Sequence, residues 1–293
     1  MNFLRTIIKG LERIGVDTYH LLDGLYLPLD RQQVLRSRNI RLIPAEKNRR
    51  GGKYSYAEWA YVIGIFQTLM FLHLDRRENN MMLDIGCGTG LLAIAAEPFI
   101  GPGGKYTGID VMQEDIDFCR RHFPAANREF IHFDVANPRY APAQNSTRSP
   151  WPVAEGSIDL LTALSVWTHL DEEDGLFYFK EIHRILKPGG KAIVTFFLLD
   201  RTYRESLDRR SEREGRFHAT SQNLWIFNQP AYGSDAWFHL EWTPVPEDAI
   251  AVTEAGLDRL REHAGLEVVA RHQGNWKEVP GMFFQDVVIF RKA

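Results

Sequence analysis

The chain has 293 residues, of which 44% are hydrophobic and 25% charged, and its formal net charge is −3 at pH 7. These values are ordinary for a globular protein that buries a sizeable core, and they exclude a largely disordered chain. Nucleic-acid-binding proteins usually carry a strong basic excess, so we expect no nucleic-acid partner.

Two cysteines, Cys87 and Cys119, are too few for a disulfide framework or a cysteine-based zinc site. No apolar run approaches the roughly 20 residues that span a bilayer. The first ten residues also lack an uninterrupted apolar stretch of signal-peptide length. We therefore expect a cytoplasmic protein, and we predict no metal site.

Residues 1–79 are predicted to form an N-terminal helical cap. Its first apolar residues recur at helical spacing with basic residues between them; they are Leu4, Ile7, Ile8, Leu11 and Ile14. We interpret this stretch as a helix packed on the main domain or on a second subunit, so the cap could support a homodimer. A basic helix lying on a membrane surface is the less favoured alternative.

Residues 31–53 carry eight Lys or Arg and a single acid, Glu46. A solvated linker is the default interpretation, and a site for an anionic acceptor is the alternative. Beyond this segment, Ser55 and Glu58 have the spacing of a capping box, which predicts a long helix that ends near Leu74.

From residue 80 onward, strands alternate with helices. The apolar run at 158–164 is typical of a strand buried on both faces. The repeated order predicts an α/β fold with a doubly wound, mostly parallel sheet in a domain that spans 80–293. The predicted strands are 81–85, 105–109, 130–133, 158–164, 191–199, 266–270 and 285–291, and the predicted helices are 91–98, 113–122, 171–186 and 253–264.

Residues 200–250 interrupt this alternation. Residues 201–216 mix both charge signs and are predicted to form an exposed helix, and the remainder is rich in aromatic residues. We interpret the segment as a lid over an acceptor, with a packing layer as the alternative. The acceptor-binding candidates within it are Trp225, Tyr232, Trp237 and His239.

The main chemical signal is the segment Asp84-Ile85-Gly86-Cys87-Gly88-Thr89-Gly90, which directly follows a predicted strand and precedes a helix. Glycines allow a tight turn and a close approach of the backbone to a ligand. The helix that follows offers free N–H groups to a polar ligand. Taken alone, such a loop could also bind a dinucleotide.

Two further acids follow the next two strands. Asp110 ends the second strand, where a carboxylate can accept hydrogen bonds from both hydroxyls of a ribose. Asp134 follows the third strand, where a carboxylate can accept from an adenine amino group. The three sites lie at the carboxyl ends of their strands, which is where open α/β sheets bind ligands.

With these motifs the chain resembles the class I S-adenosylmethionine-dependent methyltransferases, in particular those that act on small molecules. The segments 83–90, 108–111, 133–135, 157–170 and 184–190 correspond to the family's successive motifs. The resemblance covers residues 80–200 closely and extends more loosely to the end of the chain, but it does not explain residues 1–79 and 200–250. It implies a Rossmann-like sheet of seven strands with an antiparallel last strand, and S-adenosylmethionine as the cofactor.

The resemblance also implies roles for individual residues. Asp84 would organise the loop near the amino group of the cofactor, and Ser165 would lie close to its methionine end. The remaining cofactor-binding candidates are Gly86, Cys87, Gly88 and Gly90 around the methionine moiety, Asp110 and Val111 at the ribose, and Asp134 and Val135 at the adenine.

The fourth motif departs from the Asn-Pro-Pro-Tyr type, because it reads Ser165-Val166-Trp167-Thr168-His169-Leu170. His169 is the candidate general base, since histidine can take a proton near neutral pH. Positioning of the acceptor and a structural role are the alternatives. Trp167 is predicted to wall the acceptor cavity or to contact the sulfonium through a cation–π interaction.

These features predict methyl transfer to a small or medium-sized acceptor, at a hydroxyl group of a natural product, a sugar or a glycan. A nicotinamide-dependent oxidoreductase is one alternative. It is disfavoured because the loop reads Gly-x-Gly-x-Gly rather than Gly-x-Gly-x-x-Gly. A non-catalytic adaptor that keeps the same fold is the other.

Overall fold

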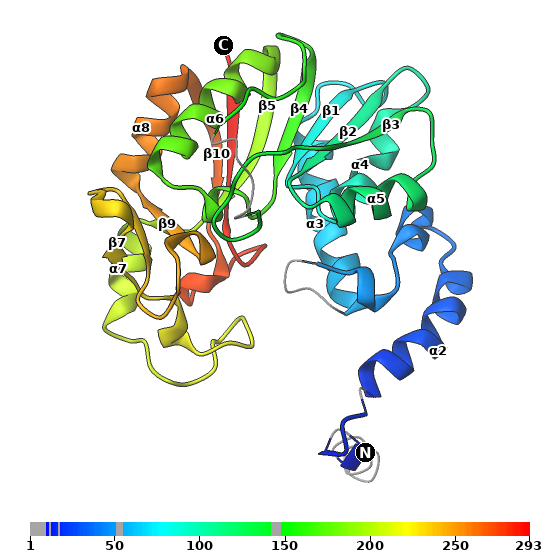
Figure 1. The fold of residues 1–293 in the computed structure, drawn as a ribbon, viewed down its shortest axis with the longest axis horizontal. Helices are drawn as coiled ribbons and strands as arrows, with labels where there is room; N and C mark the ends of the chain where they lie inside the picture. Colours follow the sequence, from blue (N-terminus) through cyan, green and yellow to red (C-terminus); the bar gives the residue numbers. More distant parts are fainter. Residues whose placement is uncertain (1–9, 12, 17, 51–54, 142–147) are drawn as a thin grey trace.

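The computed structural model describes residues 10, 11, 13–16, 18–50, 55–141 and 148–293. Its centre is a seven-stranded sheet with the order β10-β11-β5-β4-β1-β2-β3 (Figure 1). The strands are β1 (Met81–Ile85), β2 (Lys105–Asp110), β3 (Arg128–His132), β4 (Ile158–Ala163), β5 (Leu186–Phe196), β10 (Leu266–His272) and β11 (Asp286–Lys292).

Strands β1 to β5 pair in parallel, whereas β11 is antiparallel to both of its neighbours, β5 and β10. The predicted doubly wound sheet with a reversed last strand is therefore confirmed. The reversed strand also separates this fold from that of the nicotinamide-dependent alternative.

Helices cover both faces of the sheet. Side chains of α3 (Tyr56–His73), α4 (Leu91–Ile100) and α5 (Gln113–His122) belong to one buried cluster, and those of α6 (Glu172–Ile185) and α8 (Glu254–Ala264) belong to another. Consecutive strand residues alternate between the two clusters, as for Leu160 and Leu161. Because helices bury both faces, residues of both orientations are apolar, and the buried strands appear in the sequence as continuous apolar runs.

The helix starts follow from local side-chain chemistry. The hydroxyl of Ser55 accepts a hydrogen bond from the Glu58 amide at 3.0 Å, so the predicted cap of α3 is confirmed. The Asp171 carboxylate caps α6 in the same way, by accepting from the Asp174 amide at 2.8 Å. Each cap satisfies an amide that has no partner within the helix.

The segment 200–250 differs most from the sequence-based expectation. Its predicted helix covers only Arg201–Leu207 (α7), and its aromatic part supplies β7 and β8 to a four-stranded sheet with the order β6-β9-β8-β7, in which β6 and β9 come from the two ends of the segment. These strands have two to four residues each, which is too short to show a period of two in the sequence. They are β6 (Leu198–Leu199), β7 (Phe227–Pro230), β8 (Trp237–Leu240) and β9 (Ile250–Thr253).

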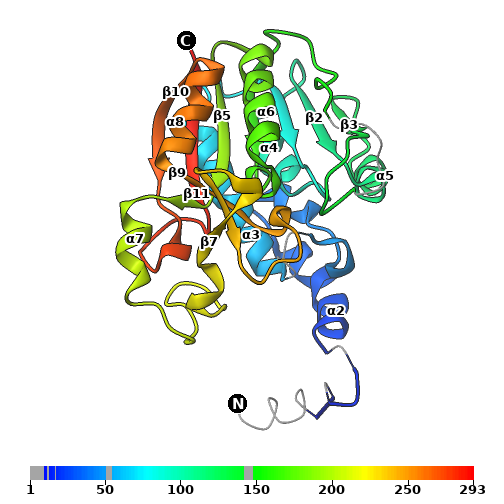
Figure 2. The ribbon, with the colours of Figure 1, turned by 60° about the vertical axis from the view of Figure 1, so that its left-hand side comes forward.

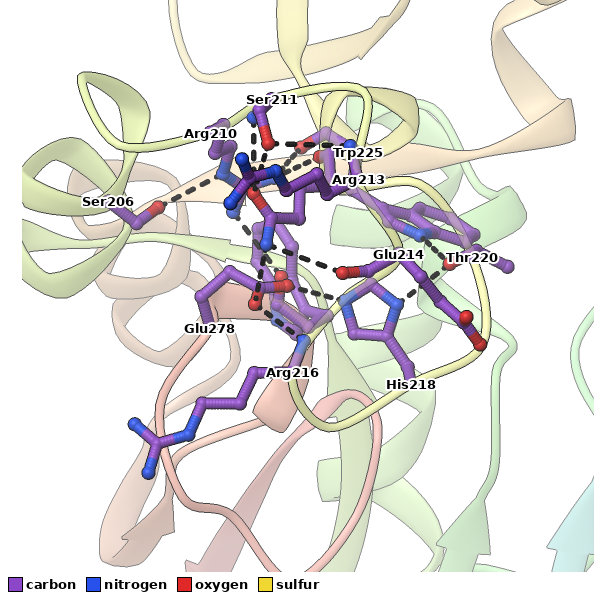
Figure 3. Close-up of polar contacts among 12 residues, drawn as sticks. Ser206, Arg210, Ser211, Arg213, Glu214, Arg216, His218, Thr220, Trp225 and Glu278 are labelled. Carbon is purple, nitrogen blue, oxygen red and sulfur yellow. Dashed lines mark hydrogen bonds and ion pairs between the residues drawn. The ribbon is translucent and has the colours of Figure 1, made fainter.

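Buried polar contacts attach this segment to the edge of the main sheet. The ammonium of Lys277, which is fully buried, lies 2.7 Å from carboxylate oxygens of both Asp200 and Asp286. Nearby, the ring nitrogens of His218 lie 2.8 Å from the Glu278 carboxylate and 2.8 Å from the Thr220 hydroxyl (Figure 3). The segment is thus attached to the connection between β10 and β11, through Lys277 and Glu278.

The N-terminal part consists of α2 (Thr18–Gln33), two short 3-10 helices (Arg38–Leu42 and Glu46–Asn48) and α3. Helix α2 stands away from the sheet layers in both views (Figures 1 and 2). It is held by the guanidinium of Arg49, which is fully buried and lies 3.1 Å from the Asp23 carboxylate. The apolar positions Leu4, Ile7 and Ile8 lie outside the described residues.

Candidate cofactor and acceptor site

A cavity of about 700 Å³ lies at the carboxyl ends of β1, β2 and β4. This volume is in the range of sites for cofactors and small ligands. The sequence predicts ten cofactor-binding residues and one catalytic residue. Nine of these eleven line the cavity, together with Trp167: Asp84, Gly86, Cys87, Gly88, Asp110, Val111, Val135, Ser165 and His169.

The glycine-rich loop between β1 and α4 has a backbone that only glycine adopts easily. Gly86, Gly88 and Gly90 have φ values of 65°, 48° and 86°. A Cβ on Gly86 would lie 2.6 Å from Cγ2 of Val166, and one on Gly90 would lie 2.3 Å from a ring carbon of Phe123. Gly90 does not line the cavity itself but allows Phe123 to pack beneath the loop.

Asp84 is buried at the start of this loop. Its carboxylate accepts hydrogen bonds from the hydroxyls of Tyr106, at 2.6 Å, and Thr162, at 2.8 Å. Burial raises the pKa of Asp84 to about 7, although both hydrogen bonds oppose that shift. A cationic group that enters the cavity beside Asp84 would favour its ionised form.

Asp110 ties the glycine-rich loop to the end of β2. Its two carboxylate oxygens accept hydrogen bonds from the backbone amides of Gly88, at 2.7 Å, and Met112, at 2.8 Å. Burial raises the pKa of Asp110, and the two amides oppose this shift. Each oxygen keeps a second lone pair, which can accept from a ribose hydroxyl.

The polar atoms of the cavity fit an adenosyl cofactor. The hydroxyl of Thr89 is buried and has no hydrogen-bond partner among the described residues, although Thr89 lines the cavity. Buried hydroxyls are normally paired, so this one is available to a ligand. Together with the bare glycine backbone and the two carboxylates, it offers polar partners suited to an amino group and to ribose hydroxyls.

The segment after β3 approaches the cavity through Phe133, Val135 and Ala136. Asp134 is exposed and is absent from the lining. Its contact with adenine therefore stays a prediction, as does that of Val135.

His169 ends a single 3-10 turn, Trp167–His169, that follows β4. Its Nδ1 atom lies 2.7 Å from the main-chain oxygen of Glu247, and its Nε2 atom lies 3.3 Å from the hydroxyl of Tyr140. A carbonyl oxygen only accepts, so Nδ1 carries the proton and Nε2 is an acceptor, which the Tyr140 hydroxyl contacts in the structure. Burial lowers the pKa of His169, which favours this neutral form.

The main chain around His169 is held by a loop that sequence analysis did not assign to the site. The Asn137 side chain donates to the main-chain oxygen of His169 at 3.0 Å. Arg139 and Tyr140, from the same loop, line the cavity. These residues lie between β3 and β4 in the chain, and only the tertiary fold brings them beside the turn that follows β4.

Ser165 has a left-handed backbone, with φ 61°, at the point where the chain leaves β4 for the cavity. Its hydroxyl accepts a hydrogen bond from the Gln285 side chain at 2.9 Å. A non-glycine residue in this conformation is costly and is often found at functional sites. The strain here turns the chain toward the cavity.

Trp167 has two roles in the structure. It lines the cavity, yet it is fully buried and packs edge to face against Phe179, with ring centroids 5.1 Å apart. Its predicted contacts with the acceptor and with the sulfonium of the cofactor stay predictions.

None of the four acceptor candidates in the segment 200–250 lines the cavity. Trp237 is fully buried in the core, and the indole N–H of Trp225 donates to the Thr220 hydroxyl at 2.7 Å. The Tyr232 hydroxyl bonds to the Glu247 carboxylate at 2.8 Å, and Nδ1 of His239 lies 3.0 Å from the main-chain oxygen of Leu240. The segment reaches the site through the Glu247 main chain instead, and the acceptor contacts of these residues stay predictions.

Comparisons with known proteins agree with this geometry. A sequence profile described as "Methyltransferase domain" matches residues 83–194. The ubiquinone biosynthesis O-methyltransferase of Idiomarina loihiensis is 27% identical over 135 residues, which are 46% of this chain and 49% of that protein. The demethylmenaquinone methyltransferase of Lactobacillus johnsonii is 27% identical over 121 residues, which are 41% of this chain and 45% of that protein.

The alignments thus span about half the length of these curated relatives. Among solved structures, the PH0226 protein from Pyrococcus horikoshii has the same fold. It shares 17% identity and a TM-score of 0.53, over 87% of this chain and 99% of that one.

The chain therefore contains a class I S-adenosylmethionine-dependent methyltransferase domain. The cofactor of this class is S-adenosylmethionine, and the residues present around the cavity fit it. Within the described parts of the chain, no group of three or more His, Cys, Asp or Glu residues is placed to hold a metal ion. None of the helices described there combines the length and apolarity that crossing a bilayer demands.

Proposed function

We propose that the protein transfers a methyl group from S-adenosylmethionine to a hydroxyl on an apolar, aromatic small molecule. The observation that carries this proposal is the Nε2 atom of His169, which is unprotonated and lies at the cavity wall, 3.3 Å from the Tyr140 hydroxyl. A hydroxyl must lose its proton as it attacks, and a neutral imidazole can accept that proton.

In this proposal the two ends of the cofactor meet different residues. Asp84 and the backbone of Gly86 and Gly88 hold the methionine end, where the amino group faces the buried carboxylate. Asp110 accepts from the ribose, and Val135 lies along the adenine. When bound, the cofactor supplies a methyl group that its sulfonium makes electrophilic.

The nature of the acceptor is inferred from the cavity walls. Aliphatic and aromatic side chains together make up more than half of the lining residues, and two of the aromatic rings, Trp151 and Tyr178, stack with centroids 5.3 Å apart. Such walls suit a flat apolar acceptor better than a sugar or a glycan. The names of the curated relatives point the same way, toward a quinone precursor or a related natural product.

We also keep the division into a cap, residues 1–79, and a catalytic domain, residues 80–293, as a proposal. The segment 200–250 then serves less as a lid than as a support, because its Glu247 main chain orients His169. The walls of the site exclude water and align the acceptor with the reacting methyl.

Calorimetric titration tests the proposal. Wild-type protein should bind S-adenosylmethionine and S-adenosylhomocysteine but not NAD. Asp110→Asn, which keeps one acceptor oxygen, should weaken adenosyl binding, and Asp110→Ala should abolish it. The control is Asp258→Ala, which removes a partly exposed carboxylate on α8 that pairs with Arg261. Binding of NAD would support an oxidoreductase, and no binding by folded protein would support an adaptor.

A further inference from the structure

Exposed apolar side chains are concentrated at the N-terminal end of the described chain. Eight of the sixteen exposed large apolar or aromatic side chains lie between Ile14 and Leu35. Single exposed leucines are common, but a contiguous group on one element indicates an interaction surface.

Most of these side chains form one face of α2. Leu21, Leu25 and Leu29 are spaced by four residues and are 63%, 61% and 57% exposed. Leu22 and Tyr26 lie beside them on the helix, at 38% and 59%. We call these five residues the leucine face of α2. It covers more than a third of the helix circumference, which is the width of a buried apolar stripe.

The protein itself uses the other side of α2. Leu27 is buried, and Asp23 pairs with the buried guanidinium of Arg49. This contact settles which side of the helix faces the body. The leucine face therefore points outward, in line with the way α2 stands off the sheet layers (Figures 1 and 2).

The chain that follows the leucine face is cationic. Its exposed charged residues from Arg36 to Lys47 are Arg36, Arg38, Arg41 and Lys47, and all of them are basic. Residues 31–50 contain a single acid, Glu46, so this segment carries a net positive charge. The whole chain, by contrast, has a formal net charge of −3.

We propose that the leucine face and these cations form a docking surface for an anionic lipid bilayer. An amphipathic helix inserts its apolar face at the level of the lipid headgroups, and adjacent Lys and Arg residues are attracted to anionic headgroups. A second copy of the chain is a poorer occupant. A symmetric pair would bring the same unbalanced cations together around the apolar contact.

The cationic segment that follows α2 also connects the docking surface to the candidate site. The chain runs from α2 to Arg50, which lines the cavity and lies 3.1 Å from the Asp115 carboxylate. A docked protein would hold the side of the cavity that Arg50 lines close to the bilayer, where apolar acceptors concentrate. Bilayer docking itself does not depend on methyl transfer.

Vesicle co-sedimentation of the full chain tests the proposal. Wild-type protein should sediment with vesicles of phosphatidylcholine and phosphatidylglycerol, much less with pure phosphatidylcholine, and less at high salt. Leu25→Glu should lower binding by roughly tenfold or more. Its matched control is Leu72→Glu on α3, where Leu72 is 64% exposed, and this variant should bind like wild type.

A second pair of variants tests the charges. Replacing Arg36, Arg38 and Arg41 together by Gln should lower binding by roughly fivefold per residue. The same change at Arg201, Arg261 and Arg291 should have no such effect. Binding of S-adenosylhomocysteine by each variant shows that the fold and the cofactor site are intact.

Several outcomes would overturn the proposal. One is wild-type protein that binds neither vesicle type; another is equal loss in the test and control variants. A third is a wild-type dimer in light scattering that Leu25→Glu converts to a monomer, which would assign the leucine face to contact between two copies. None of these results would alter the calorimetric test of cofactor binding.

Discussion

The Nδ1 atom of His169 lies 2.7 Å from the main-chain oxygen of Glu247. This contact joins the turn after β4 to the segment between β8 and β9, and it sets which ring nitrogen carries the proton. The other nitrogen then faces the cavity as an acceptor. The relationship leads directly to two predictions about proton transfer.

The first concerns substitution of the histidine. His169→Gln should lower kcat by roughly 10²- to 10⁴-fold, which is the usual contribution of a general base. Binding of S-adenosylhomocysteine should stay unchanged, because His169 is not among the proposed cofactor contacts. Steady-state rates and calorimetry check both parts. His263→Gln on α8 is the control, and unaltered turnover in His169→Gln would leave the histidine only a structural role.

The second concerns pH. Burial lowers the pKa of His169 from its ordinary value of 6.5, so the imidazole is neutral at pH 7 and becomes protonated only at lower pH. We expect kcat/KM for the acceptor, measured at saturating S-adenosylmethionine, to be level near neutrality and to fall in acid with a midpoint below 6.5. Profiles of wild type and His169→Gln between pH 4.5 and 9 test this expectation. An acid limb that persists in the variant would point to another group.

Asp84 leads to a third prediction, on cofactor affinity. Its pKa is raised to about 7 by burial, so much of the carboxyl is protonated in slightly acidic solution. The amino group of the ligand needs the ionised form. Affinity for S-adenosylhomocysteine should therefore rise by about tenfold between pH 6 and 8. Titrations at several pH values should show this rise in wild type but not in Asp84→Asn.

Thermal unfolding gives an independent readout of Asp84. Its folded pKa lies above the unfolded value of 3.8, so the folded state binds more protons between pH 4 and 7. The contribution of this group to stability is present in acid and is lost as pH rises through about 7. The Tm of Asp84→Asn relative to wild type should therefore be more favourable at pH 8 than at pH 5.

A fourth prediction separates backbone strain from steric conflict. Gly90→Ala combines φ 86° with a Cβ only 2.3 Å from Phe123, whereas Gly156→Ala has φ 59° and open space around the Cβ. The control should lose roughly 1–2 kcal/mol from backbone strain alone. Gly90→Ala should lose clearly more and should also weaken cofactor binding. Chemical denaturation measures the loss of stability in each of the two variants. Equal losses would show that Phe123 moves aside freely.

The fifth prediction concerns the attachment of α2. Asp23→Ala leaves the buried guanidinium of Arg49 without its carboxylate, and breaking a buried pair in this way costs about 3–5 kcal/mol. That cost exceeds what the few other contacts of α2 supply, so the helix should detach. Hydrogen exchange should rise over Thr18–Gln33 and stay low over β1, β4 and β5. Unchanged exchange in α2 would show that Leu27 suffices to hold it.

Much of the main domain could be predicted from the sequence. The hydrophobic pattern predicts strands at 81–85 and 105–109. Asp84 and Asp110 lie at the ends of these strands beside the glycine-rich loop, so the predicted strands and the predicted cofactor residues agree. Gly86, Asp84 and Asp110 could be assigned because each role depends on residue type and local spacing. These are short-range properties, which a sequence displays directly.

The acceptor side could not be predicted in the same way. Tyr140 reaches His169 from a loop between β3 and β4, and Glu247 reaches it from beyond β8, so only the tertiary fold brings them together. Trp237 shows the same limit, because aromatic character alone cannot distinguish a cavity wall from a core. In the fold its side chain is fully buried in a core cluster, and its contact with an acceptor stays a prediction.

The reversed strand β11 also bears on how the chain matures during synthesis. Strands β1 to β5 can pair as soon as they emerge, since each neighbour is already made. The outer edge of β5, however, stays open until Asp286 arrives, after α7, the small sheet, α8 and β10 have been translated. An open strand edge invites pairing with other chains. Until β11 is made, the edge of β5 is therefore a place where unfinished chains can pair with one another.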